Sequence, residues 1–287
     1  MNLRLIVSAT VVLALLVSPA LALRADLGGG EGNNEFTFLG PTAWDPGLNT
    51  SRTNVGPAPG GASWSAMPAG ITISGNAVFE TITGGGDHPD LDTTTDIETM
   101  ITAGADGLEY GLFNSAFNVW AAAAAITNLG KVADGALIVP TGAVGDAEAF
   151  NGHLGDIRVA GLTFDGAFGV LAHAYAPGTE TSDFFHTIGG DVHFDVGETW
   201  ADDPTDTTGD ADFDFFTVAL HELGHSLGLG HSEVVGSVME PIYAGARRTL
   251  HPDDIAGIQA IYGVPEPTSI VLVLLGSLGL LAVRRRG

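Results

Sequence analysis

The sequence predicts an α+β domain in which a mixed, twisted sheet of about five strands packs with three helices. Two kinds of segment support this fold class. Short runs rich in β-branched and aromatic residues lie between glycine-rich links, and longer runs carry apolar residues at helical spacing. The length of 287 residues suits one such domain, alone or with a small appendage.

The first 22 residues predict an export signal. A basic start at residues 1–4 precedes an apolar run at 5–17 and the small-residue sequence Ala-Leu-Ala at 20–22, in the order typical of a secretory signal peptide. A buried helix is the competing interpretation. Residues 23–63 are rich in Gly, Asn and Pro, so we expect a loose extension there and the folded domain at 64–263.

The first part of the domain predicts one strand and one long helix. Residues 69–80 read as a strand with a turn at 75–76. Residues 96–129 read as a helix, with or without a break at 104–107. An apolar stripe on this helix indicates core rather than a cofactor site; it consists of Leu112, Phe113, Ala116, Phe117 and Trp120.

In the second part of the domain, short strands alternate with glycine-rich links, which suit tight connections and metal loops. Asp212 or Asp214 is expected to cap a helix at 215–228, because a carboxylate accepts hydrogen bonds from first-turn N–H groups. A last helix at 252–262 closes the domain. The expected strands are 136–139, 156–159, 170–175 and 191–194.

Residues 221–231 carry the strongest functional signal. They read H-E-L-G-H-S-L-G-L-G-H and fit H-E-x-x-H-x-x-G-x-x-H, a pattern of catalytic zinc sites. On a helix, His221 and His225 lie nearly on one face, so both can bind one ion. Gly228 can end the helix and turn the chain, so that His231 becomes the third ligand.

The same motif predicts hydrolytic chemistry. Three protein nitrogens leave a fourth zinc position for water, which a structural zinc site avoids. Glu222 follows the first ligand, where it can act as general base on the zinc-activated water without being a ligand itself. A helix that carries spaced histidines by chance is the competing interpretation, and the fit of every fixed position argues against it.

Residues after the motif add a family resemblance. Met239 lies eight residues after His231. The zinc-binding helix, the third histidine and this methionine together resemble the metzincin clan of zinc peptidases, in which a methionine turn forms a floor beneath the metal. Ser232, directly after the third histidine, is the residue that matrixins, the matrix metalloproteinase family, have at this place.

Further similarity to the matrixins extends over residues 96–263. Pro241-x-Tyr243 resembles the wall of the S1′ pocket, which takes the side chain just after the scissile bond. Residues 250–263 look like the closing helix of the family. The resemblance implies a metzincin-like catalytic fold, with a pocket floor that depends on the loop 244–249.

Two upstream segments, 164–175 and 190–200, resemble matrixin loops that hold structural ions. Calcium binds six to eight oxygens from carboxylates and carbonyls, and the acid-rich loops supply both. Solvated loop acids are the alternative interpretation. The resemblance implies one calcium at Asp165, Asp195 and Glu198 with the carbonyls of Gly166, Phe168 and Val170, and a second at Asp156 and Asp191 with the carbonyl of Gly189.

A second, structural zinc is less complete in this sequence. His173 and His193 match two of the four matrixin ligands, but the loop that supplies the other two is shortened to residues 158–163 and contains neither. Two ligands do not form a closed tetrahedral site. Histidines satisfied by protein contacts in strands are the alternative. The residues that could complete the site are His153, Asp183 and His186.

The absence of cysteine is a further departure from the animal matrixins, in which a propeptide cysteine binds the zinc and holds the enzyme inactive. Cysteine is not among the 287 residues, so disulfides and thiolate ligands are excluded. Any inhibition before export must therefore work differently.

The last segment, 264–287, predicts surface sorting. It contains V-P-E-P-T at 264–268, an apolar run at 269–283 and three arginines at 284–286. This arrangement resembles the PEP-CTERM signal of Gram-negative bacteria. The resemblance implies that the tail associates transiently with the inner membrane, that an exosortase processes it, and that the protein reaches the cell surface or the extracellular matrix. A plain membrane anchor is the alternative.

Charge restricts the partners. Residues 23–263 contain 33 acidic and 6 basic side chains, a net charge of about −27 with His neutral, which argues against a nucleic-acid partner.

From the zinc motif, the family resemblance and the two ends of the chain, we expect an exported zinc endopeptidase that acts on proteins or peptides. The alternative is a surface or matrix protein that uses the fold for binding without turnover, although a pure binder has no need of Glu222. A zinc hydrolase of other substrates leaves the Pro241-x-Tyr243 wall unexplained.

Overall fold

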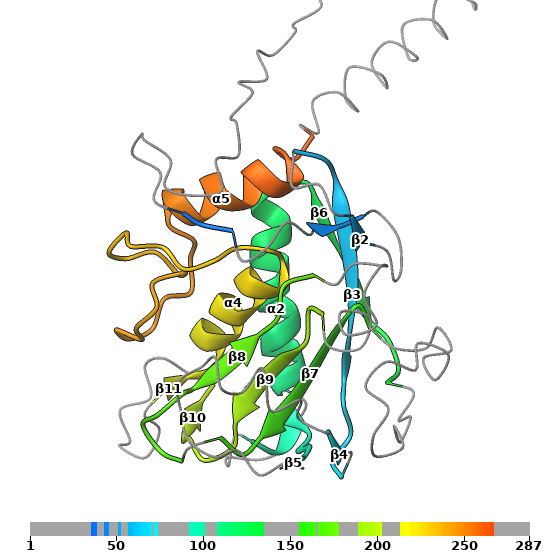
Figure 1. The fold of residues 1–287 in the computed structure, drawn as a ribbon, viewed down its shortest axis with the longest axis vertical. Coiled ribbons are helices and arrows are strands. Elements are labelled where there is room, and N and C mark those ends of the chain that lie inside the picture. The colour runs from blue at the N-terminus through cyan, green and yellow to red at the C-terminus, as the bar shows by residue number, and fades with distance from the viewer. Residues whose placement is uncertain are drawn as a thin grey trace, which may run out of the picture.

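The computed structural model describes eleven stretches of the chain: residues 36–38, 43–45, 51–52, 57–70, 72–73, 92–100, 108–134, 155–164, 166–177, 189–202 and 213–266. Within them, a five-stranded mixed sheet packs with three α-helices (Figure 1). The predicted α+β class is therefore confirmed.

The main sheet has the strand order β6-β3-β7-β9-β8. Four strands run parallel, and β8 at the edge runs antiparallel to β9. Their bounds are β3 (Gly60–Ala66), β6 (Ile126–Lys131), β7 (Ile157–Leu162), β8 (Ala172–Ala174) and β9 (Val192–Asp195).

Shorter elements surround this sheet. The three pairs are β1 (Ala43–Trp44) with β2 (Ser51–Arg52), β4 (Thr72–Ile73) with β5 (Asp92–Thr93), and β10 (Trp200–Ala201) with β11 (Phe213–Asp214). A 3₁₀ turn, η2, covers Ile97–Thr99. The last pair leads directly into the helix that carries the zinc motif.

The helices are α2 (Leu108–Ala123), α4 (Phe215–Ser226) and α5 (Pro252–Tyr262). In Figure 1, α2 and α4 lie side by side against the sheet, and α5 lies across the end of α2. The indole Nε1–H of Trp120 donates to the carbonyl of Leu220 at 2.9 Å, which joins α2 to α4. This contact fixes the zinc-binding helix to the core.

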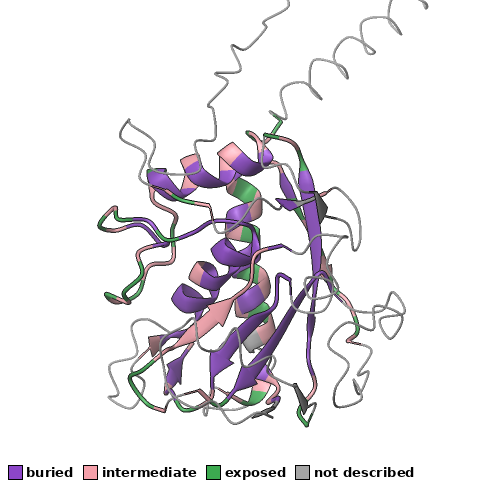
Figure 2. Ribbon diagram, viewed as in Figure 1, coloured by how far each residue is buried: buried purple, intermediate pink, exposed green. Residues whose placement is uncertain are grey.

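The core lies between the sheet and the helices, as the buried residues in Figure 2 show. The expected apolar stripe of α2 is part of it, because Phe113, Phe117 and Trp120 are fully buried. Trp64 of β3 and Phe194 of β9 meet them from the sheet side. Burial of large aromatic side chains is the main stabilising contribution in such a core.

Several expected boundaries are wrong. The loose extension was expected to reach residue 63, but β3 begins at Gly60 and forms an inner strand of the sheet. The helix expected to reach residue 129 ends at Ala123, because Ile126–Lys131 pairs with β3 as strand β6. β6 lacks apolar alternation, whereas the short alternation of Ala62, Trp64 and Ala66 with serines is a signal that could have revealed β3.

The expected loop at 158–163 is also wrong, because residues 158–162 continue β7 between β3 and β9. Of the strand expected at 69–80, the structure describes residues 69–70 and 72–73, and the latter two form β4. The strand at 136–139, the export signal and the apolar run at 269–283 lie outside the described residues. Among the described helices, none is long and apolar enough to cross a bilayer.

Candidate active site: a histidine triad on α4

Helix α4 begins where β11 ends, and its first turn is capped as predicted by Asp214. The carboxylate of Asp214 accepts hydrogen bonds from the backbone N–H of Thr217 at 3.1 Å and from the Thr217 hydroxyl. Arg248 forms an ion pair with the same carboxylate. Two partners thus hold the charged cap at the start of the metal-binding helix, where the helix dipole favours an anion.

The motif brings three histidines together. His221, His225 and His231 each offer a ligand atom, and these atoms lie within 4.8 Å of one another. No other group of three such side chains occurs among the described residues. His221 and His225 lie one turn apart on α4, whereas His231 follows the helix. Gly228 has a φ of 104°, which suits glycine and lets the chain turn toward the site, as expected.

Backbone carbonyls orient two of the rings. The Nδ1 of His221 lies 2.7 Å from the carbonyl oxygen of Val238, and the Nδ1 of His225 lies 2.7 Å from that of Leu229. A ring that uses Nδ1 in this way presents Nε2 to a metal. Burial lowers the pKa of His221 to about 4 and holds the pKa of His225 well below its ordinary value, so both rings are neutral at neutral pH, as zinc binding requires.

Glu222 is buried next to the first ligand. Its Oε2 has no hydrogen-bond partner in the described part of the chain. Burial raises the pKa of this carboxyl to about 8. A nearby cation would oppose that shift, because it favours the charged carboxylate. A buried carboxylate oxygen with no internal partner beside three imidazoles fits a general base next to a metal.

Met239 lies beneath α4, as the metzincin resemblance implied. It is almost completely buried, and a Cβ placed on Gly224 would lie 2.3 Å from its sulfur. Only a glycine at position 224 therefore lets the methionine approach the helix between the two ligand histidines. A buried apolar side chain therefore packs against α4 at Gly224, a contact that is compatible with the floor that the resemblance implies.

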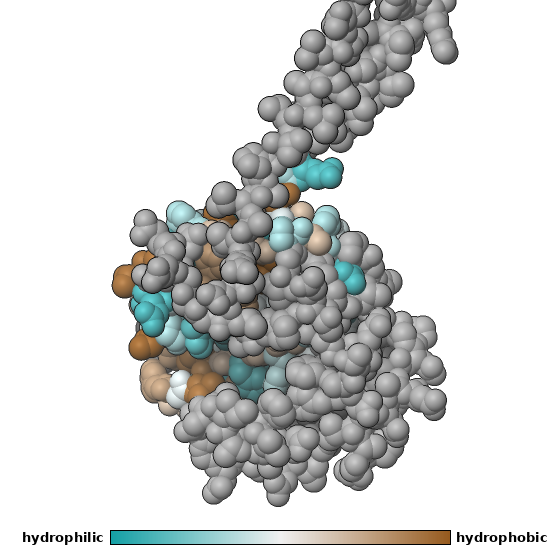
Figure 3. All heavy atoms as spheres, turned by 45° about the horizontal axis from the view of Figure 1, so that its top comes forward, coloured by the Kyte–Doolittle hydropathy of each residue, from teal (hydrophilic) through white to brown (hydrophobic). Residues whose placement is uncertain are grey.

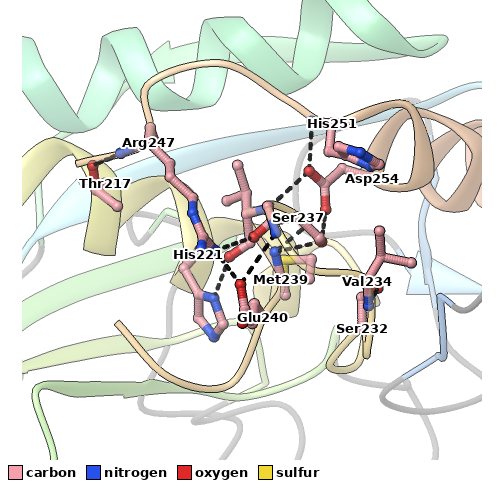
Figure 4. A network of polar contacts seen from close by, with 12 residues as sticks. Thr217, His221, Ser232, Val234, Ser237, Met239, Glu240, Arg247, His251 and Asp254 are labelled. Carbon is pink, nitrogen blue, oxygen red and sulfur yellow. Dashed lines mark hydrogen bonds and ion pairs between the residues drawn. The ribbon is translucent and has the colours of Figure 1, made fainter. Parts of the chain in front are cut away.

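The Met turn is tied to α5 by a network of hydrogen bonds (Figure 4). The carboxylate of Asp254 accepts the backbone N–H of Val238 at 2.9 Å and that of Met239 at 3.3 Å. It also accepts the backbone N–H of His251 at 2.7 Å and the hydroxyl of Ser237. Because the carbonyl of Val238 contacts Nδ1 of His221, this network lets α5, which carries no zinc ligand, help to position His221.

The expected S1′ wall lies in the loop between α4 and α5. The hydroxyl of Tyr243 accepts the backbone N–H of Asp214 at 3.1 Å, so the wall is joined to the start of α4. Arg247, in the loop expected to form the pocket floor, donates through Nη1 to the carbonyl of Ser237 at 2.7 Å and pairs with Glu240 at 2.7 Å. Figure 4 shows this side chain beside His221.

The first expected calcium site keeps two carboxylates with free oxygens. The Oδ1 of Asp195 accepts the N–H of Gly197 at 2.7 Å, and the Oε1 of Glu198 accepts the N–H of Gly169 at 3.2 Å. Their other oxygens, Oδ2 and Oε2, are buried without a hydrogen-bond partner among the described residues. These oxygens fit a hard cation. Gly166, Phe168 and Val170 lie in the adjoining loop, and Asp165 lies outside the described residues.

The second expected calcium site is already bonded within the protein. Asp156 accepts the N–H and the hydroxyl of Ser63, each at 2.7 Å, and Asp191 accepts the N–H of Arg158 at 3.2 Å. Burial raises the pKa of Asp191 to about 7, and the charge of Arg158 opposes that shift. Arg158, which forms an ion pair with Asp134 at 2.9 Å, is therefore a built-in cation near Asp191. Gly189 is buried at the turn before β9.

The two expected structural-zinc ligands contact each other. Nε2 of His173 lies 2.9 Å from Nδ1 of His193, which is hydrogen-bond distance, and the ring of Phe164 stacks on His173 at 4.8 Å. This contact gives one nitrogen of each ring a partner, whereas Nε2 of His193 is buried without a hydrogen-bond partner among the described residues. His153, Asp183 and His186, which could complete the site, lie outside the described residues.

Sequence reasoning missed several residues that build the site. Asp254 and Asp253 read as ordinary acids in the first turn of a helix, where they are common. Arg247 and Ser237 had no motif. Thr37 belongs to the stretch expected to be loose, yet it contacts the backbone of the third ligand. Only long-range contacts show these roles.

Comparison with known families settles the affiliation, because the matrixin family matches residues 109–263, more than half of the chain. The chain belongs to the matrixin family. In a matrixin, the histidine triad implies a catalytic zinc. The PEP-CTERM protein-sorting motif matches residues 263–286 and indicates exosortase-mediated sorting to the surface in bacteria.

This matrixin is similar to several animal proteins. It is 47% identical over 117 residues to stromelysin-1 of Rattus norvegicus, 49% over 104 residues to neutrophil collagenase of Homo sapiens, and 50% over 103 residues to matrilysin of Rattus norvegicus. These matches cover 39%, 35% and 35% of this chain. They cover 22%, 20% and 34% of the relatives, so the chain spans about a third of their length or less.

Proposed function

We propose that this matrixin is an exported zinc-dependent endopeptidase, with His221, His225 and His231 as metal ligands and Glu222 as general base. The observation that carries the proposal is the convergence of three neutral imidazoles beside a buried carboxylate without an internal partner. Structural zinc sites have four protein ligands, whereas this cluster has three.

The residues of the chain divide the reaction between them. A zinc ion held by the triad would polarise the scissile carbonyl and make a water molecule more acidic. Glu222 accepts a proton from the attacking water and then donates it to the leaving amine. The C–N bond breaks, and the oxygen of water becomes part of the new carboxylate. Val238 and Leu229 keep the ligand rings in place through their carbonyls.

An extended peptide fits between two walls. Strand β8 is an edge strand of the sheet and lies against α4, so a substrate can add to its outer edge by backbone hydrogen bonds. Pro241 and Tyr243 form the opposite wall. Figure 3 shows hydrophobic residues gathered on the side that carries the loop between α4 and α5, where Val235 and Ile242 are exposed. Apolar substrate side chains are therefore expected near this wall.

Calcium at Asp195 and Glu198 is part of the proposal, because their buried free oxygens need a cation. Bound between the loop 166–170 and β9, the ion would stabilise the loop that leads into β8. A structural zinc is not proposed, since His173 and His193 supply only two ligands and no group of three possible ligands forms around them among the described residues. For export, we propose that residues 1–22 are removed and that the tail lies transiently in the inner membrane of a Gram-negative-type cell before an exosortase processes it.

A matched pair of measurements tests the function. Purified protein and its Glu222→Gln variant are offered a peptide library, and bound zinc is counted in both. We expect cleavage by the wild type only, with equal zinc content, because Gln cannot accept the proton. Zinc-loaded wild type that cleaves nothing would favour the alternative of a surface or matrix binding protein. Activity in the zinc-loaded variant would refute the role of Glu222.

A further inference from the structure

The three zinc ligands are not held equally. His221 and His225 lie on α4, and a backbone carbonyl fixes each ring through Nδ1. His231 lies beyond the helix and is exposed, and no hydrogen bond joins its ring to another described residue. The position of the third ligand therefore depends on its backbone.

A segment nearly two hundred residues earlier in the chain holds that backbone. The hydroxyl of Thr37 donates to the carbonyl of His231 at 2.7 Å, across a sequence separation of 194 residues. The N–H of Gly230 donates to the carbonyl of Thr37 at 2.8 Å. Phe38 forms an antiparallel bridge with Leu229. Residues 36–38 thus pair with residues 229–231 like a short added strand.

Close packing shows that the contact is specific. A Cβ on Gly230 would lie 2.3 Å from the hydroxyl oxygen of Thr37, so residue 230 must be glycine for the two segments to approach this closely. Phe36 anchors the other end, since its ring lies 3.0 Å from a Cβ placed on Gly257 in α5. The segment is therefore fixed to both α5 and the chain that carries His231.

Directly after His231, the N–H of Ser232 donates to the carbonyl of Met239 at 2.9 Å. His231 thus lies between two backbone attachments, one to the Met turn and one to residues 36–38. The Met-turn attachment belongs to the folded domain. The other attachment comes from a stretch whose sequence gave no sign of order.

We propose that residues 36–38 position His231 for zinc binding, with Thr37 as the positioning residue. This segment supports the site rather than blocking it, so its loss weakens zinc retention. Its effect on the zinc site is the opposite of that of an inhibitory propeptide. The part of the proposal that concerns turnover rests on the proposed function, whereas the part that concerns zinc does not.

The test uses the full chain with Thr37→Val, which removes the hydroxyl and keeps the shape, and Thr37→Ser, which keeps the hydroxyl. Thr99→Val is the matched control, because the Thr99 hydroxyl donates to the carbonyl of Asp96 at 2.7 Å in an exposed turn away from the zinc ligands. Zinc release to an excess of a coloured chelator is followed for each protein, together with thermal unfolding and peptide cleavage.

We expect Thr37→Val to release zinc roughly three- to tenfold faster than the wild type, as loss of one hydrogen bond implies. Thr37→Ser should restore the wild-type rate, and Thr99→Val should leave it unchanged. Turnover of Thr37→Val should fall in kcat with little change in KM, since Thr37 is joined to a ligand and not to the substrate walls. A general structural role would instead lower the unfolding temperature without this split.

Equal zinc release from Thr37→Val and the wild type would overturn the proposal, as would failure of Thr37→Ser to restore the rate. Thr37→Ala is the second variant in case the valine side chain disturbs folding; it adds no bulk and should also release zinc faster. If the wild type binds zinc but cleaves no peptide, the proposed function fails, while the zinc-release comparison still decides the role of Thr37.

Discussion

Replacing Gly224 by alanine tests the Met floor directly. Gly224 lies in α4 between the two helical ligands. An added Cβ would lie 2.3 Å from the Met239 sulfur, 3.0 Å from its terminal methyl carbon and 3.0 Å from the Trp120 ring. Ordinary contacts between such atoms are about 3.5–4 Å. The methionine must therefore move by about 1 Å or more.

Two effects of opposite sign set the magnitude. Alanine is favoured over glycine in a helix by about 0.5–1 kcal/mol. Overpacking of a well-filled core costs about 1–3 kcal/mol, and the upper part of that range applies because Met239 and Trp120 are both buried and Trp120 is bonded to Leu220. We therefore expect Gly224→Ala to lower the free energy of unfolding by about 2 kcal/mol.

Thermal and denaturant unfolding measure this change, and zinc release reports whether the floor has moved. For a domain of this size, 2 kcal/mol corresponds to roughly 4–8 °C in Tm. Gly111→Ala in α2 is the matched control, because nothing lies within 4 Å of a Cβ at that position. The control should stabilise the protein by about 0.5–1 kcal/mol through helix propensity alone.

The reasoning is refuted if Gly224→Ala stabilises the protein as Gly111→Ala does. A double variant adds a second check: in a Met239→Ala background, the cost of Gly224→Ala should shrink by about 1–2 kcal/mol, since the clashing sulfur is gone. Independent, additive effects of the two substitutions would show that the residues do not touch.

Three further predictions concern the network, the ligands and calcium. Asp254→Asn replaces one carboxylate oxygen, an acceptor, by an amide NH2, a donor that faces backbone N–H groups. The free energy of unfolding should therefore fall by about 2–4 kcal/mol, and zinc should dissociate faster. Wild-type stability in denaturant would contradict this. Burial lowers the pKa of His221 from an ordinary 6.5 to about 4, so protons compete with zinc for this ligand only at lower pH. Zinc release during acid titration should therefore have its midpoint below pH 6.5. A midpoint above that value would argue against buried, neutral ligands. Calcium at 100 times its Kd should raise the free energy of unfolding by about 2.7 kcal/mol, and Asp195→Asn combined with Glu198→Gln should abolish the gain; a Tm unchanged by a calcium chelator would exclude the site.

The catalytic site could be predicted from sequence because its chemistry is local. The residues His221, Glu222 and His225 lie on one helix, and helical geometry alone brings the two histidines together. Gly228 supplied the turn to His231 through its backbone freedom. The strands and helices with clear apolar spacing were predicted for the same reason, since each pattern reports on its own segment.

Other features could not be predicted because their partners are distant in the chain. Strand β3 is glycine- and serine-rich, and its apolar alternation covers only residues 62–66, whereas its place between β6 and β7 depends on pairing with distant segments. The histidines at 173 and 193 match zinc ligands by type and position, and only the folded chain shows that their rings lie within hydrogen-bond distance of each other. A sequence motif gives the type of residue at a position, whereas only the folded chain shows which residue it contacts.

The sequence alone therefore determined the metal chemistry, the family and the sorting signal, all of which depend on short contiguous motifs. Only the tertiary structure decided how that chemistry is held. Asp254 from α5 supports the Met turn, Gly224 admits Met239, and Thr37 holds the backbone of the third ligand. The physical reason is that each of these contacts joins segments brought together by burial of the core, and no local spacing in the chain records them.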